Sequence, residues 1–142
     1  MNADHCLVER EGHVLIITLN RPEAKNALSA GMMAGMYRAW RTLDEDPDLR
    51  VGILTGRGDV FCAGADLKAM GGGDRDEEFQ KLMAEVPDLH WQALLRHNRP
   101  MKPIIAINEK SMTTMTIHTA WRLLRFTKSM TSVIISPIFI ND

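Results

Sequence analysis

Charge of one sign, cysteine and long apolar runs are all scarce in this chain of 142 residues. The formal net charge is −1 and the basic residues are scattered, so we expect no nucleic-acid partner. No apolar run approaches the roughly 18 residues of a membrane span, and the start lacks the basic and apolar regions of a secretory signal. The two cysteines, Cys6 and Cys62, lack metal-ligand and CxxC spacing, so we expect reduced thiols and no metal. We therefore predict a cytoplasmic protein without a membrane partner.

Glycine is missing from the last 69 residues, because all ten glycines lie at or before Gly73. Residues 111–142 hold ten serines and threonines but only one of the 18 acidic residues, Asp142, whereas the preceding part holds four serines and threonines. This break in composition divides the chain into residues 1–107, a domain, and residues 108–142. We expect the second segment to be an aberrant tail, translated from a shifted reading frame or left by truncation of the gene.

Apolar periodicity predicts an α/β fold in the first segment. Residues 13–19 carry apolar side chains on both faces, so we expect an interior strand that pairs with 6–10 through a glycine-containing turn and runs parallel to 51–55. Apolar residues at helical spacing follow Ser29, a good N-cap, and predict a helix down to Asp44. The other expected elements are helical segments at 76–86 and, after Pro87, from Leu89 to about Asn98, a strand at 104–107, and in the tail a helix around 117–124 and strands at 133–135 and 138–140.

Two short motifs near residue 57 do not indicate a function. The run from Gly56 begins like a dinucleotide-binding loop, but Phe61 occupies the position of the third glycine and would block the approach of a pyrophosphate. We therefore exclude NAD binding. The tripeptide Arg57-Gly58-Asp59 recurs by chance in unrelated chains, and we interpret it as a surface turn.

The segment from Asp59 to Lys68 is the strongest candidate for a binding site. It follows a predicted strand, and Cys62-Ala63-Gly64-Ala65 carries no side chain large enough to block a ligand. Asp66 is a good N-cap for a short helix at 67–70, so backbone N–H groups here are placed to hold an anion or a polarised carbonyl oxygen. Most such segments are only structural, and this one by itself decides nothing.

Two further motifs stand in the right order beside this segment: Asn20-Arg21-Pro22 and Lys25-Asn26-Ala27-Leu28. Together the three motifs closely resemble the crotonase family, which includes the enoyl-CoA hydratases and isomerases, over residues 6–107. The resemblance implies the N-terminal part of a crotonase fold, an α/β spiral of ββα units similar to ClpP, in subunits that form trimers or hexamers. It also implies an acyl-CoA thioester as substrate, with CoA as part of that substrate and no separate cofactor.

The resemblance assigns roles to eight residues. The amide N–H of Ala65 would donate to the thioester carbonyl oxygen, which becomes negatively charged in an enolate-like transition state. The other residues that the resemblance implies are Ala63, Gly64, Asp66 and Leu67, which would line the acyl-CoA loop, and Lys25, Ala27 and Leu28, which would meet the pantetheine and nucleotide, with Lys25 near a phosphate.

The family's second glycine-rich loop, which would supply the other donor, has no counterpart at residues 108–116, where glycine is absent. We do not assign Glu109 as the catalytic carboxylate, and none of His90, His97 and His118 has a recognisable partner that would make it a base.

Three functions therefore stay open. One is an enoyl-CoA hydratase or isomerase that is impaired in this form. Another is a non-catalytic chain that binds CoA weakly or only associates with homologous subunits, which half an oxyanion hole favours for this polypeptide. The third is decarboxylation, thioester hydrolysis or dehalogenation, because these reactions share the same oxyanion loop.

Overall fold

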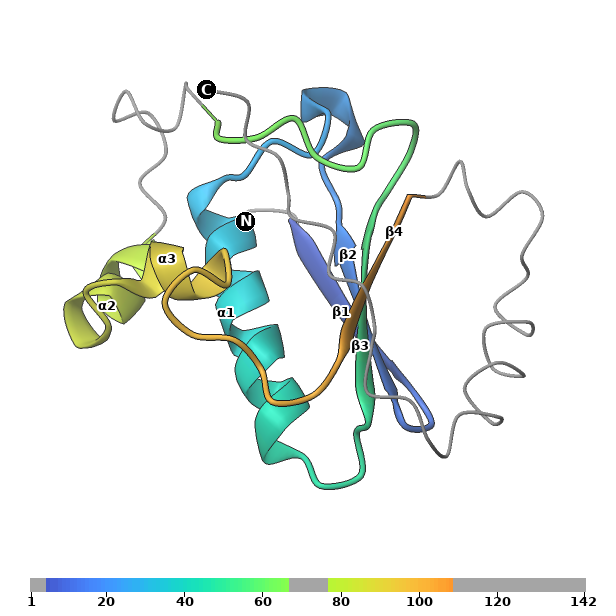
Figure 1. Cartoon of the computed structure of the whole chain (residues 1–142). Helices are drawn as coiled ribbons and strands as arrows, with labels where there is room; N and C mark the ends of the chain where they lie inside the picture. The colour runs from blue at the N-terminus through green and yellow to red at the C-terminus, as the bar shows by residue number, and fades with distance from the viewer. Residues whose placement is uncertain (1–4, 67–76, 109–142) are drawn as a thin grey trace.

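In the part of the chain that the structure describes, a four-stranded sheet carries helices on one of its faces (Figure 1). The computed structural model describes residues 5–66 and 77–108. The elements, in chain order, are β1 (Cys6–Glu11), β2 (Val14–Leu19), the 3-10 helix η1 (Pro22–Ala24), α1 (Ala30–Glu45), β3 (Val51–Gly56), α2 (Glu77–Glu85), α3 (Leu89–Ala93) and β4 (Ile104–Asn108). The elements predicted for the tail and the short helix predicted at 67–70 lie outside the described residues.

The strands lie side by side in the order of the sequence, β1-β2-β3-β4. β1 and β2 form the predicted antiparallel hairpin, and Gly12 closes its turn with a φ of 58°, a conformation that favours glycine. β2 pairs with β3 in parallel, and β3 with β4 in parallel. β2 is therefore the interior strand that its two apolar faces predicted, with Ile17 fully buried.

Helix α1 packs across β1 and β2 and begins where the sequence predicted. The Ser29 side chain accepts a hydrogen bond from the backbone N–H of Met32 at 3.2 Å, which satisfies one of the free donors at the helix start. Gly35 lets the helix approach β1, because a Cβ atom there would lie 2.5 Å from the Cβ of Cys6. The core between helix and sheet includes Leu15, Ile17, Leu19, Met32, Met36, Tyr37, Trp40, Leu43 and Leu54.

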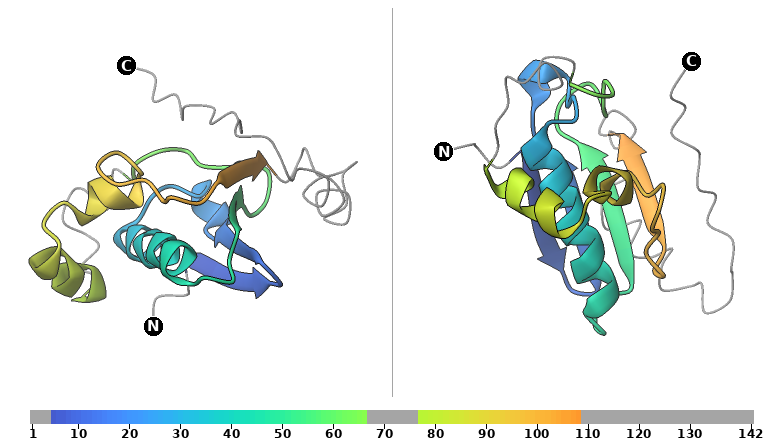
Figure 2. Two further views of the ribbon diagram at one scale, coloured as in Figure 1. Left: turned by 60° about the horizontal axis from the view of Figure 1, so that its bottom comes forward. Right: turned by 90° about the vertical axis from the view of Figure 1, so that its left-hand side faces the viewer.

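Helices α2 and α3 contact α1, and Figure 2 shows them on the same side of the sheet as α1. α2 ends before Pro87, as predicted. The prediction that the next helix continues to about Asn98 is wrong, because α3 ends at Ala93. Leu95 adopts the left-handed conformation with a φ of 58°, and the N–H of Arg96 donates to the carbonyl of Trp91 at 2.8 Å. This is a Schellman motif, in which the left-handed residue is usually glycine. Because leucine occupies that position here and continues the helical spacing, the sequence did not indicate the end of the helix.

Trp40 connects α1 to α3, and replacing it by phenylalanine should weaken that packing. Its indole Nε1–H donates to the carbonyl of Ala93 at 2.9 Å in a buried position. Because Trp40→Phe leaves this carbonyl unpaired and removes part of a buried ring, we expect a loss of about 2 kcal/mol in the free energy of unfolding. Urea unfolding followed by far-UV circular dichroism measures it. Trp91→Phe is the control, since Trp91 is 38% exposed and its replacement should cost less than about 0.5 kcal/mol.

Candidate functional site

Two loops meet at the carboxyl end of the parallel strand pair β2 and β3, one following each strand (Figure 1). Three backbone hydrogen bonds join them. The N–H of Ala63 donates to the carbonyl of Lys25 at 3.0 Å, the N–H of Leu28 donates to the carbonyl of Gly64 at 2.8 Å, and the N–H of Asp66 donates to the carbonyl of Leu28 at 3.2 Å. The fold therefore brings together the two motifs that the sequence placed more than thirty residues apart.

The bridge between Leu28 and Ala65 sets the direction of the Ala65 amide. It is a parallel bridge in which Leu28 forms hydrogen bonds with the two neighbours of Ala65: its N–H donates to the carbonyl of Gly64, and its carbonyl accepts from the N–H of Asp66. The N–H and carbonyl of Ala65 itself therefore point away from Leu28. No group among residues 5–66 and 77–108 accepts a hydrogen bond from the Ala65 N–H, and Ala65 is exposed. This amide is consequently available to a ligand, while its catalytic role stays a prediction.

Gly64 gives the loop after β3 a backbone conformation that favours glycine. Its φ is 93°, a conformation that side chains rarely adopt, and a Cβ atom there would meet no atom within 4 Å. The requirement for glycine is therefore conformational and does not come from lack of space. The open surroundings also agree with the expectation that no side chain at 62–65 obstructs a ligand.

Asn26 holds the two loops together from inside, a role that the sequence analysis missed. Its side chain is fully buried, and its Nδ2 donates to the carbonyls of Arg57 at 2.9 Å and Val60 at 2.6 Å. Its Oδ1 accepts from the backbone N–H of Arg21 at 2.8 Å. Lys25 and Asn26 are both left-handed, with φ of 51° and 54°. The asparagine just after Pro22 could have indicated a left-handed turn here, because asparagine tolerates the left-handed conformation better than most residues.

A second connection between the loops is an ion pair of Arg21 and Asp66, which the sequence analysis also missed. Nη1 of Arg21 lies 2.8 Å from Oδ2 of Asp66 and donates to the carbonyl of Ala27 at 3.0 Å. The two side chains are only 16% and 14% exposed. The carboxylate of Asp66 is thus engaged by a guanidinium from the neighbouring loop; its predicted cap on 67–70 lies outside the described residues.

The other predicted site residues surround this junction. Lys25 and Ala63 are exposed, Ala27 and Leu28 are half-buried, and the Leu28 side chain packs against the core. Leu67 lies outside the described residues. The loop pair therefore contains seven of the eight predicted positions, and the motifs from both loops lie next to one another; the roles of these residues stay predictions.

The ionisable groups of the described chain provide no evident base or nucleophile at the junction. Burial raises the pKa of the Cys62 thiol, although the Gly64 N–H, which donates to its Sγ at 3.4 Å, opposes that effect. The thiol therefore stays protonated at neutral pH. Both cysteines are free, as expected. No group of three or more histidine, cysteine or acidic residues suited to a metal ion occurs in the described part of the chain.

The two histidines near α3 do not lie in the loop pair. Nδ1 of His97 lies 2.9 Å from Oδ2 of Asp88, at the start of α3. This hydrogen bond, and a weaker contribution from Gln92, hold the pKa of the Asp88 carboxyl below its usual value. Glu109 and His118 lie outside the described residues.

Within residues 5–66 and 77–108, no helix is long and apolar enough to cross a membrane.

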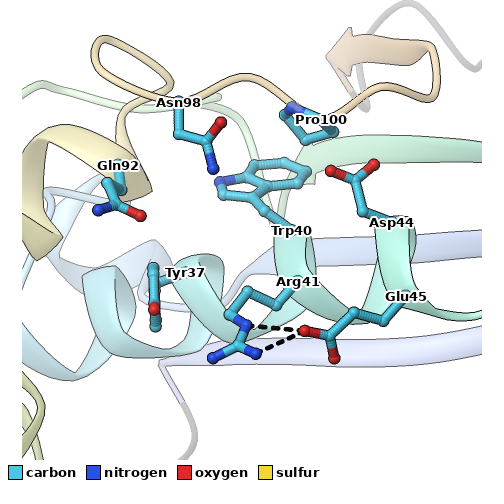
Figure 3. Close-up of a pocket in the computed structure, with 8 residues that line it drawn as sticks. All are labelled: Tyr37, Trp40, Arg41, Asp44, Glu45, Gln92, Asn98 and Pro100. Carbon is cyan, nitrogen blue, oxygen red and sulfur yellow. Dashed lines mark hydrogen bonds and ion pairs between the residues drawn. The ribbon is translucent and has the colours of Figure 1, made fainter. Parts of the chain in front are cut away.

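A hollow of about 320 Å³ lies elsewhere, between α1 and the segment after α3 (Figure 3). Arg41 and Glu45 on its rim pair with each other, with Arg41 Nε 3.0 Å from the Glu45 carboxylate. The hollow is lined by Tyr37, Trp40, Arg41, Asp44, Glu45, Gln92, Asn98 and Pro100. None of the predicted site residues is among them, so we assign the candidate site to the loop pair.

Comparison with known proteins identifies the family. A family model described as enoyl-CoA hydratase/isomerase matches residues 9–113. Enoyl-CoA hydratase EchA19 of Mycobacterium tuberculosis is 48% identical over 103 residues, which are 72% of this chain and 38% of that protein. (E)-Benzylidenesuccinyl-CoA hydratase of Thauera aromatica is 38% identical over 100 residues, which are 70% of this chain and 37% of that protein.

Solved structures agree with these matches. An enoyl-CoA hydratase from Mycobacterium tuberculosis superposes with a TM-score of 0.59 at 40% identity, over 73% of this chain and 37% of that one. A carnitinyl-CoA hydratase from Mycobacterium avium superposes with a TM-score of 0.62 at 35% identity, over 74% of this chain and 38% of that one. The chain spans little more than a third of the length of these relatives. With the N-terminal part of the crotonase fold confirmed, the chain belongs to the enoyl-CoA hydratase/isomerase family.

Proposed function

We propose that the loop pair binds an acyl-CoA thioester and that the Ala65 N–H donates to its carbonyl oxygen. The observation that carries this proposal is the exposed Ala65 amide, which has no acceptor among the described residues and which the bridge to Leu28 directs outward. Gly64 and Ala63 leave the approach to it open. A donor held in place by two backbone hydrogen bonds of its neighbours does not have to reorganise when charge develops on the oxygen.

The reaction we propose is hydration of a 2-enoyl-CoA thioester, or movement of its double bond. Both build negative charge on the thioester oxygen, and a fixed N–H donor stabilises that charge by about 3–4 kcal/mol in comparable sites. The relatives named above are hydratases of different CoA thioesters, which supports the CoA thioester and leaves the acyl group open.

A non-catalytic role is the second candidate, and the Arg21–Asp66 ion pair favours it. Asp66 is the acidic residue next to the donor, and its carboxylate is occupied by Arg21. It is therefore poorly suited to activate water or move a proton. In this role the described domain binds CoA or an acyl-CoA weakly, or associates with homologous subunits, without turning the ligand over.

Several accompanying properties complete the proposal. CoA enters as part of the substrate, without a separate cofactor or metal. Lys25, which is exposed, meets a phosphate of the nucleotide in this proposal. Ala27 and Leu28 meet the pantetheine arm, and Leu67 joins the acyl-CoA loop. We also propose a cytoplasmic location and assembly into trimers or hexamers, both on the strength of family membership.

Titration calorimetry with acetyl-CoA and with free CoA tests the thioester contact. Both ligands carry the nucleotide and pantetheine, but only acetyl-CoA has the carbonyl oxygen. Since one hydrogen bond contributes about 1 kcal/mol, we expect acetyl-CoA to bind roughly fivefold more tightly than CoA. Equal affinities would contradict the assignment of the donor. Loss of the conjugated thioester absorbance of crotonyl-CoA then separates the enzyme from the non-catalytic chain.

A further inference from the structure

We propose that Arg21 is a positioning residue for the Ala65 donor: its guanidinium fixes Asp66, the residue after the donor, and cancels the negative charge of that carboxylate beside the thioester oxygen. This inference rests on the proposed function. It concerns a residue of the β2 loop that contributes through Asp66 and does not itself contact the substrate.

The contacts place Arg21 between the two loops. Its Nη1 is shared by the Asp66 carboxylate at 2.8 Å and the carbonyl of Ala27 at 3.0 Å. The backbone of Arg21 is fixed in turn, because its N–H donates to Oδ1 of Asn26 and its carbonyl accepts from the N–H of Asn26, both at 2.8 Å. The guanidinium therefore starts from a rigid base and reaches across to the other loop.

Two contacts of Asp66 with the other loop affect the donor. Its N–H donates to the carbonyl of Leu28, and its side chain is fixed by Arg21. On the other side of Ala65, the Gly64 carbonyl accepts from the N–H of Leu28. Without the ion pair, the anchor at Asp66 would lose its buried side-chain contact with the other loop and would keep the backbone hydrogen bond of 3.2 Å. The direction of the Ala65 N–H would then be less well defined.

Charge gives Arg21 a second effect at the same place. A thioester oxygen that accepts from the Ala65 N–H becomes more negative in the transition state, and Asp66 places a carboxylate one residue away. Like charges in a poorly solvated position repel each other strongly. Both side chains of the ion pair are about 85% buried, so water screens the Asp66 carboxylate little and the guanidinium supplies the neutralising charge.

The geometry also predicts which replacement restores the effect. A single nitrogen, Nη1, makes both contacts. The Nε of Arg21 is buried and has no hydrogen-bond partner among the described residues. A lysine ammonium can therefore take over the two contacts and removes the unsatisfied Nε–H, whereas glutamine keeps the polarity but not the charge.

The experiment measures the preference for the thioester, defined as the dissociation constant of CoA divided by that of acetyl-CoA, in the full 142-residue chain by calorimetry. Arg21→Gln should lower this preference at least threefold, toward one. Arg21→Lys should recover most of it, and the double variant Arg21→Gln/Asp66→Asn should recover part of it, because the negative charge that Arg21 no longer neutralises is gone. The matched control is Arg41→Gln, which breaks an exposed ion pair on α1 and should leave the preference unchanged.

Two outcomes would overturn the inference while the proposed function stands. One is an unchanged preference in folded Arg21→Gln. The other is a double variant whose preference for the thioester is as low as that of Arg21→Gln, which would show that the charge of Asp66 has no effect on the preference. A merely structural effect of Arg21 would weaken the binding of CoA and acetyl-CoA equally and would leave their ratio unchanged.

A ligand-free measurement covers the case in which the wild-type chain shows no preference, so that the proposed function itself fails. In Arg21→Gln, the amide hydrogen of residue 66 should exchange at least tenfold faster than in wild type, while exchange in β2 and β3 stays unchanged. If Arg21→Gln does not fold, Asp66→Asn should show the same acceleration. Unchanged exchange at residue 66 would count against Arg21 as a positioning residue.

Discussion

Replacing Asn26 by aspartate is expected to lower the free energy of unfolding by about 3–5 kcal/mol, because it places a carboxylate in a fully buried position and turns the oxygen that replaces Nδ2 toward two carbonyl oxygens. The change exchanges one amide nitrogen for one oxygen, with hardly any difference in volume. The two carbonyls that now accept from Nδ2, those of Arg57 and Val60, lose their donor and face a negative charge instead. Urea unfolding followed by circular dichroism measures the loss.

Two controls isolate the cause of this loss. Asn98→Asp makes the same chemical change at an exposed position and should alter stability by less than about 0.5 kcal/mol. Asn26→Gly keeps the freedom to adopt a φ of 54° but removes the amide, so its smaller loss measures the missing hydrogen bonds without the added charge. If Asn26→Asp proves as stable as wild type, the amide does not hold the loops together.

Replacing Ala65 by proline should abolish the preference for a thioester over free CoA, because proline has no amide hydrogen. Any crotonyl-CoA hydration by this chain should fall by about 10²–10³-fold, which is the cost of losing one oxyanion donor. The fold should tolerate the ring, since the Ala65 nitrogen points away from Leu28 and the two anchoring hydrogen bonds belong to residues 64 and 66. Calorimetry and the thioester absorbance provide the measurements.

Ala65→Ser is the matched control for the proline variant. It also adds atoms at an exposed position but retains the N–H, so it should keep both the preference and any turnover. Urea unfolding of both variants shows whether the proline ring has disturbed the loops. A proline variant that still prefers acetyl-CoA would mean that another group contacts the carbonyl oxygen.

Most of the fold could be predicted because its signals are local. The continuous apolar run of β2 and the helical spacing after Ser29 depend only on neighbouring residues, and the structure confirms both elements. The end of α3 could not be predicted in this way, since a left-handed leucine at residue 95 terminates it where glycine would be the usual signal. A backbone conformation that the residue type does not favour leaves no trace in hydropathy.

The candidate site was predictable in its backbone parts and not in its side-chain connections. Small residues at 62–65 indicated an open loop, and the family resemblance grouped this loop with the motif at 25–28. The buried amide of Asn26 and the ion pair of Arg21 with Asp66 depend on which loops meet in space, across 31 to 45 positions of sequence. Polar residues in loops normally face water, so nothing in the sequence indicated these buried contacts.

The agreement between strand order and chain order has a consequence for how the protein folds. The β1–β2 hairpin closes through a two-residue turn, the pairing with the lowest loop-closure entropy in the sheet. β3 and β4 are then each added beside the strand that precedes them in the chain. No described strand has to be inserted between two that are already paired, so the sheet can grow in the direction of synthesis, with each parallel crossover closing onto an edge that already exists.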